Sequence, residues 1–297
     1  MKIAGFTIIR NAIKYDFPVI ESIKSILPIC DTFYVSIGNS EDSTQELIQS
    51  IQSQKIKISH SQWDDTLRKN GEVLAVETNK LIHIIPEDYD WLFYLQADEV
   101  IHEEDLSKIK MGMENNLDNK NIDGLLFNYI HFFGSYQFIG NSRKWYRNEI
   151  RVIRNNKNIL SYKDAQGFRK KDGSKLAVKS THAKVFHYGW VKHPKDMLNK
   201  IKNNQAFYTP KEKMGKTQIE MEKMFPNLEF DYNQFDVLKK FEGSHPKVMK
   251  QRIDKKNWNF QPDYSKIHFR KRRYYFLYLI EKYFGVRLFE YKNYILK

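Results

Sequence analysis

The stretch WLFYLQADE, residues 91–99, decides the fold class. Its first five residues are apolar or aromatic, which is typical of a strand buried on both faces of a parallel sheet. Gln96, Asp98 and Glu99 follow at once. Because ligands of open α/β sheets bind outside the carboxyl ends of the strands, this is a candidate site. Carboxylate oxygens there can hold Mg²⁺ or Mn²⁺ with substrate phosphates, whereas an acidic opening of a helix near Glu103 is the competing interpretation.

Strand and helix patterns alternate upstream of this segment. We expect strands at 3–9, 33–37 and 56–59 and helices at 18–27, 43–51 and 68–85. Pro18 suits a first helical turn and Pro28 stops that helix, while Ser43 and Glu46 have the spacing of a capping box. This alternation predicts a parallel sheet with helices on both faces.

Downstream, strand patterns at 122–133 and 149–154 predict that mixed strands complete the sheet. KVFHYGW, residues 184–190, has the pattern of a final strand, and 197–207 that of a helix. His187 lies in this strand among aromatic residues. A neutral imidazole there suits Mn²⁺, although such a histidine is more often a hydrogen-bonded core residue.

Composition narrows the classes of protein. The 297 residues carry a formal net charge of +13, which favours anionic partners. The single cysteine, Cys30, excludes an internal disulfide and fits a reducing compartment. The N-terminus lacks a signal-peptide cleavage pattern, and no apolar run reaches the ~20 residues of a spanning helix. We therefore expect a cytoplasmic protein, with peripheral binding to the inner face of the membrane left open.

The order of these segments resembles family 2 glycosyltransferases of the GT-A fold, of the bacterial surface-polysaccharide type. SEDST, residues 40–44, is similar to the STDGT turn of that family, and LQADE, residues 95–99, is similar to its metal-binding LDADE. The resemblance covers about the first 190 residues. It implies a Rossmann-like mixed sheet flanked by helices, in a domain that we place at 1–245.

The resemblance also implies an activity. It is a metal-dependent, inverting transfer of a sugar from a UDP-, GDP- or dTDP-linked donor to a hydroxyl of a glycan or lipid-linked glycan. Asp98 stands at the metal-binding aspartate and His187 at a further ligand, for Mn²⁺ or Mg²⁺. Gln96 stands where the family usually has the first aspartate of this motif. We expect it to have a polar role near the ribose of the donor. The donor-binding candidates are Arg10, Asn11, Asn39, Asp42, Asp65, Arg68, Gln96 and Arg151.

An inverting transfer needs a carboxylate that takes the proton of the acceptor hydroxyl. Asp164 is the preferred base, because it lies where related enzymes carry their catalytic acidic residue, and a turn-forming role is its competitor. Glu149 is the second candidate. An ordinary ion pair with Arg147 or Arg151 competes there.

Residues 246–297 form a basic, aromatic extension, in which Arg270, Lys271, Arg272 and Arg273 precede a run of tyrosine and phenylalanine. A helix that packs on its own domain is the first interpretation, an anionic membrane surface the second and nucleic acid the last. Two other functions stay open: a nucleotidyltransferase acting on sugar phosphates, for which no glycine-rich phosphate loop follows the first strand, and a nonenzymatic basic binding protein.

Overall fold

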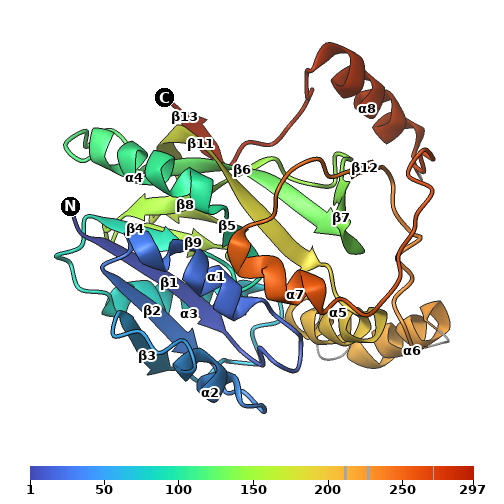
Figure 1. Cartoon of the computed structure of the whole chain (residues 1–297), viewed down its shortest axis with the longest axis horizontal. Helices are drawn as coiled ribbons and strands as arrows, with labels where there is room; N and C mark the ends of the chain where they lie inside the picture. The colour runs from blue at the N-terminus through green and yellow to red at the C-terminus, as the bar shows by residue number, and fades with distance from the viewer. Residues whose placement is uncertain (211–212, 226–227, 270) are drawn as a thin grey trace.

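The computed structural model describes residues 1–210, 213–225, 228–269 and 271–297. Arg270, part of the basic run singled out above, lies outside the described residues. Figure 1 shows one twisted sheet with helices on both faces and the two termini near the same end of the molecule. The expected α/β, GT-A, Rossmann-like fold class is confirmed.

The first half of the sheet is parallel. Strands β1 (Ile3–Ile9), β2 (Thr32–Ile37), β3 (Ile56–His60) and β4 (Trp91–Tyr94) lie in the order β3-β2-β1-β4. All seven residues of β1 and all four of β4 are buried, as continuous apolar runs predict for strands covered on both faces. Their carboxyl ends therefore open on one edge of the sheet.

The second half is mixed. Strand β8 (Asn148–Arg154) pairs antiparallel with β4 and with β6 (Gly124–Phe133). The 15-residue strand β11 (Leu176–Trp190) runs parallel to β6 and antiparallel to β5 (Glu99–Ile101). The shorter strands are β7 (Ser135–Gly140), β12 (Leu238–Lys240) and β13 (Tyr294–Leu296), and β9 (Ile159–Tyr162) with β10 (Gly167–Lys170) forms a separate hairpin.

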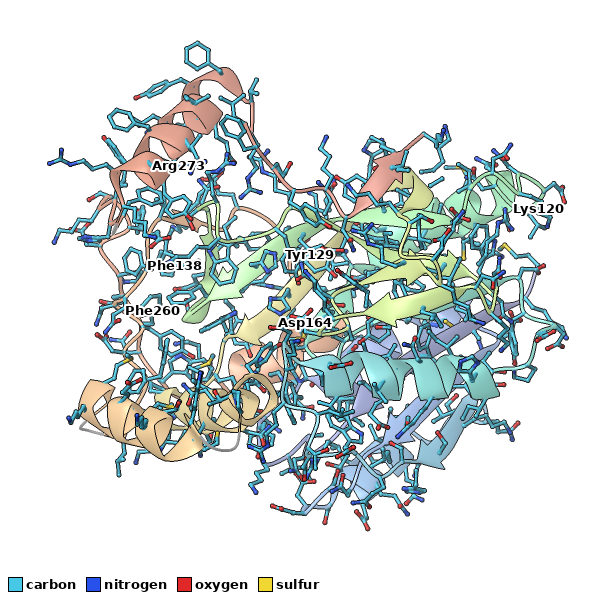
Figure 2. The ribbon with its side chains drawn as sticks, turned by 180° about the vertical axis from the view of Figure 1, so that it is seen from behind. Lys120, Tyr129, Phe138, Asp164, Phe260 and Arg273 are labelled. Atoms are coloured by element: carbon cyan, nitrogen blue, oxygen red, sulfur yellow. The ribbon has the colours of Figure 1, made fainter. Side chains whose placement is uncertain are left out.

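Helices cover the two faces separately. Helices α1 (Val19–Ile26), α2 (Thr44–Gln49) and α4 (Leu106–Asn115) contribute to one apolar core. Helix α3 (Glu72–Ile84) and the β9–β10 hairpin contribute to the other, which lies toward the viewer in Figure 2. Among the described residues, no helix is both long and apolar enough to cross a membrane.

Some local expectations were wrong. Helix α3 begins at Glu72 rather than 68, because residues before Gly71, whose φ is +69°, form turns. Ile84, expected on the buried face of that helix, is 55% exposed. The capping box does not form: Ser43 makes no side-chain cap, and Asp42 instead accepts from the Thr44 amide at 3.1 Å.

The C-terminal third returns to the sheet. Helices α5 (Pro194–Tyr208) and α6 (Met214–Met224) precede the short elements η4 (Lys247–Met249) and α7 (Lys250–Asp254), and Met249 is fully buried. Helix α8 (Arg272–Phe284) then stands away from the sheet in Figure 1, and β13 comes back to pair with β11. The division at residue 245 stays a prediction.

Candidate active site

The two acidic residues after β4 have different surroundings. Glu99 is fully buried and accepts two hydrogen bonds of 2.7 Å from Arg151, which is also fully buried. Its carboxylate also accepts from Tyr129 Oη and from the Gln96 amide. A buried ion pair of this kind holds the turn together, because each charge compensates the other where water is absent.

Asp98 instead faces Lys200 of α5. Its Oδ2 accepts from Lys200 Nζ at 2.9 Å, and the same ammonium donates to the Gly189 carbonyl at 2.9 Å. Burial alone would raise the pKa of Asp98, but the Lys200 ammonium reverses that effect and holds this pKa well below its usual range. Asp98 is therefore a carboxylate at any physiological pH.

His187 lies on the other side of the Asp98 carboxylate. Its Nε2 is 3.8 Å from Asp98 Oδ1, beyond hydrogen-bond distance. Gly189 keeps this space open: a Cβ there would lie 2.6 Å from Asp98 Oδ2 and 2.7 Å from His187 Nε2. The strand can bring the two side chains together only because residue 189 has no side chain.

A chain of hydrogen bonds fixes the orientation of His187. His131, its register partner on β6, faces it with an Nδ1 to Nδ1 distance of 3.1 Å, and His131 Nε2 lies 2.8 Å from the Tyr146 carbonyl. A carbonyl only accepts, so His131 Nε2 carries a proton. Burial lowers the pKa of both imidazoles, which favours their neutral forms. In that state His187 Nδ1 donates to His131, and His187 Nε2 presents a lone pair beside Asp98.

These side chains open into a cavity of about 390 Å³ at the carboxyl ends of β1 and β4. Aromatic residues from several elements form much of its surface, including Phe17, Trp63, Trp190 and Phe207. Five of the sequence-predicted site residues line it together: Arg10, Gln96, Asp98, Asp164 and His187.

The other donor-binding candidates lie outside the lining. Asn11 and Asp42 fix the turn after β2, where Asn11 Oδ1 accepts from the Glu41 amide and Asp42 Oδ2 from the Lys14 amide, each at 2.7 Å. Asn39 accepts from the Trp63 amide. Asp65 pairs with Arg10 at 2.7 Å, and Arg68 Nε donates to the Asp65 carbonyl.

Arg151 is likewise absent from the lining, since its guanidinium is paired with Glu99. It also donates from Nη1 to the Gln166 carbonyl at 2.8 Å, and Gln166 does line the cavity. Arg151 thus holds the segment that carries Asp164.

The two candidate bases differ in position. Asp164 lines this cavity and also a second one, of about 570 Å³, and its Oδ2 accepts from Tyr208 Oη at 3.3 Å. Figure 2 shows Asp164 near the middle of the molecule. Glu149 lines only the second cavity. Burial raises the pKa of Glu149 to about 7 against the opposing effects of Arg151 and Gln166.

Sequence reasoning missed Lys200, His131 and Tyr146. Lys200 belongs to a helix expected at nearly its observed place, but nothing distinguishes it from neighbouring lysines in the chain. His131 lay in an expected strand, and only the pairing register with β11 places it beside His187. The presence of one histidine in each of two apolar strands was the one sequence feature that could have indicated this pair.

The described residues contain no group of three or more His, Cys, Asp or Glu side chains arranged around a common metal position. Asp98 Oδ1 and His187 Nε2 still fit a cation held in part by its substrate. Mg²⁺ in particular keeps several waters and is often bound by one or two protein carboxylates with substrate phosphates. The space over Gly189 leaves room for such a cation, and the lone pair of His187 provides a ligand beside the Asp98 carboxylate.

Comparisons with known proteins give fold-level similarity only. No family model matches the chain, and no curated protein matches it. The similar solved structures include GT-A glycosyltransferases. TarS of S. aureus is 15% identical with a TM-score of 0.38, and the match covers 68% of this chain and 39% of TarS. The matched part of the chain thus spans about two fifths of the length of TarS.

Two further structures have similar scores. Glucosyl-3-phosphoglycerate synthase from Mycobacterium tuberculosis, in complex with Mn²⁺, UDP and phosphoglyceric acid, is 13% identical with a TM-score of 0.31, covering 44% of this chain and 43% of that one. The 4-diphosphocytidyl-2C-methyl-D-erythritol synthase from Anaerococcus prevotii DSM 20548 is 9% identical with a TM-score of 0.38, covering 69% and 95%. Likeness this distant assigns no substrate.

Proposed function

We propose that this protein is a metal-dependent glycosyltransferase that moves a sugar from a nucleotide-diphosphate donor to a hydroxyl group, with inversion at the anomeric carbon. The observation that carries the proposal is the pair Asp98 and His187, which direct two electron-pair donors into a space kept open by Gly189. This pair lies in a cavity at the carboxyl ends of parallel strands, where α/β proteins bind nucleotides.

Asp98 and His187 would hold Mn²⁺ or Mg²⁺. Once bound, the cation would supply a Lewis acid that neutralises the diphosphate leaving group. The second carboxylate oxygen of Asp98 remains with Lys200, so the same aspartate serves a metal and an ammonium through different atoms.

Basic side chains would complete the diphosphate site. Lys200 lines the cavity with its ammonium fixed between Asp98 and the Gly189 carbonyl, and Arg10 lines it from the end of β1. Positive groups fixed in advance stabilise the negative charge that develops on a leaving group. The donor is a UDP-, GDP- or dTDP-linked sugar in this proposal, with Gln96 near its ribose.

Asp164 is the proposed general base. It lies where the two cavities meet, so it can reach an acceptor hydroxyl on one side and the donor sugar on the other. Tyr208 donates to Oδ2 and leaves Oδ1 for the acceptor proton. Glu149 does not line the cavity of about 390 Å³, which we call the donor cavity, and we assign it a positioning role.

The proposed acceptor is a glycan or a lipid-linked glycan of bacterial surface-polysaccharide assembly at the cytoplasmic face of the membrane. Support comes from the exposed aromatic side chains around α8, among which Phe284 is 76% and Phe289 is 82% exposed. Exposed aromatics beside Lys271, Arg272 and Arg273 suit an anionic membrane surface. Sedimentation with vesicles containing phosphatidylserine tests this: binding should fall in Phe284→Ser/Phe289→Ser, and unchanged binding would reject it.

The function is tested by measuring nucleotide release from UDP-, GDP- and dTDP-linked sugars, with Mn²⁺ and with excess chelator. We expect release from one donor class, lost with chelator and in Asp98→Asn. Release that survives chelator but disappears in Lys200→Met would assign the cationic role to Lys200 and reject metal dependence. No release from any donor, with no UDP, GDP or dTDP binding in Mn²⁺, would reject the enzyme.

A further inference from the structure

The larger of the two cavities, of about 570 Å³, lies between the sheet and the C-terminal segment. One side of it comes from residues 143–149 and 162–167, the other from residues 273–294. Its volume is within the range of small-molecule sites. Tyr146, Asp164 and Gln166 line this cavity and the donor cavity alike, so the two meet at the proposed base.

The C-terminal side of the cavity is held in place at several points. Glu281 of α8 accepts from Arg143 and forms ion pairs with Arg147 and Arg287. Farther along, Tyr291 Oη accepts from Arg169 at 2.5 Å. Strand β13 then pairs with β11 directly after the lining residues. The cavity is thus a built feature of the chain, closed by residues far apart in sequence.

The lining carries an excess of positive charge. Its six basic residues are Arg143, Lys144, Arg147, Lys163, Arg273 and Arg287, against the acidic residues Glu149, Asp164 and Glu290. One carboxylate, Glu281, is shared by three of the arginines and cannot neutralise them all. Lys163 and Arg273 are both exposed, and Lys163 Nζ lies over the Tyr162 ring at 5.2 Å from its centroid. Two exposed cations are therefore available to a ligand.

Aromatic rings complete the lining. They include Trp145, Tyr146, Tyr162, Tyr274 and Tyr291. Rings of this kind provide the flat apolar surface on which a sugar ring packs, with phenolic hydroxyls at the rim for its polar groups. Cations beside aromatic rings define a ligand with a carbohydrate body and an anionic substituent.

We propose that this cavity binds the acceptor and that the sugar of the acceptor that lies in it bears a phosphate or carboxylate group. This inference rests on the proposed function, in which a sugar is transferred from the donor cavity to an acceptor. Lys163 and Arg273 hold the anionic group, while an acceptor hydroxyl reaches Asp164 at the boundary with the donor cavity. The C-terminal extension is in this account part of the acceptor site, whatever its relation to a membrane.

The test is equilibrium binding of glucose 6-phosphate, glucuronate and glucose to the full chain saturated with UDP and Mn²⁺. We expect the two anionic probes to bind at least tenfold more tightly than glucose. The affinities of glucose 6-phosphate and glucuronate, compared with each other, identify whether a phosphate or a carboxylate group is preferred. In Lys163→Gln/Arg273→Gln their affinity should fall at least tenfold, since charge-assisted hydrogen bonds are lost.

The matched control is Lys171→Gln/Lys282→Gln, which removes two exposed cations next to the same segments but outside the lining. It should bind both probes as the wild type does. Equal binding of glucose and its phosphate, an unchanged affinity in the Lys163/Arg273 variant, or tighter binding of a single-stranded oligonucleotide would overturn the proposal. Failure of the glycosyltransferase assignment is read separately, from the absence of nucleotide binding and release.

Discussion

The donor cavity and the second cavity share Asp164 but are built differently. Around Asp98, polar groups are buried and matched one to one: Lys200 is paired with its carboxylate, and His131 with His187. Around Glu281, several arginines share one carboxylate, and cations on the rim are exposed. Fixed, compensated charges suit chemistry on one bond, whereas an excess of exposed charge suits recognition of varied ligands.

The largest effect is expected at the boundary between the two cavities. Asp164→Asn keeps the shape of the side chain but removes the base, so sugar transfer should fall by about 10²- to 10⁴-fold. UDP affinity in the presence of Mn²⁺ should change little, because the variant keeps every charged group that is proposed to bind the diphosphate. The exposed Asp172→Asn is the control. A variant at Asp164 with more than a tenth of wild-type turnover would remove it from the base role.

The next effect concerns stability on the acceptor side. Glu149 has an unfolded pKa near 4.5 and a folded pKa of about 7, so the folded state binds the proton more tightly. Its contribution to stability therefore falls as pH rises from 4.5 to 7. Relative to wild type, Glu149→Gln should gain up to about 3 kcal/mol in free energy of unfolding at pH 8 and nothing at pH 4.

Urea unfolding at the two pH values checks this sign, with the exposed Glu87→Gln as control. A loss of stability at pH 8 would show that the carboxylate is instead stabilised by its neighbours. The same variant should also keep its UDP affinity, because Glu149 does not line the donor cavity.

A moderate effect is expected from His131, which we regard as a positioning residue. His131→Asn breaks the hydrogen bonds to His187 and to the Tyr146 carbonyl, and Mn²⁺ affinity should fall by about 10- to 100-fold. Electron paramagnetic resonance of free Mn²⁺ measures this without any turnover. His182→Asn, at an exposed position of β11, the strand that carries His187, should leave the affinity unchanged. Equal affinities in the two variants would remove His131 from the metal site.

The donor cavity could be predicted from the sequence in part, whereas the second cavity could not. LQADE and the apolar strand before it placed Asp98 at the sheet edge, because both features are local. Lys200 lies 102 residues from Asp98, and its contact depends on how α5 docks on the sheet. Arg143 and Glu281 lie 138 residues apart, so the second cavity has no local pattern at all. Glu99 is an acidic residue next to Asp98, and Arg151 was expected to bind the donor. In the structure these two residues form an ion pair with each other instead.

The smallest effect is expected at the pair of Arg10 and Asp65. Because the Asp65 side chain is 53% exposed, Asp65→Asn should change the free energy of unfolding by less than about 1 kcal/mol. Asp65 does not line the donor cavity, so UDP affinity should change by less than threefold. A tenfold or larger loss of UDP affinity, measured by calorimetry, would assign Asp65 the donor contact expected from the sequence.

The central claim is that Asp98 and His187 grip a cation that carries the donor diphosphate, and the effect of Mn²⁺ on UDP affinity tests it most directly. Mn²⁺ should tighten UDP binding to the wild type and to Gly215→Ala, whose added methyl meets nothing within 4 Å. It should have no effect on Gly189→Ala, whose Cβ would fill the space between the two ligands. Equal tightening in Gly189→Ala, or none in the wild type, would contradict the account.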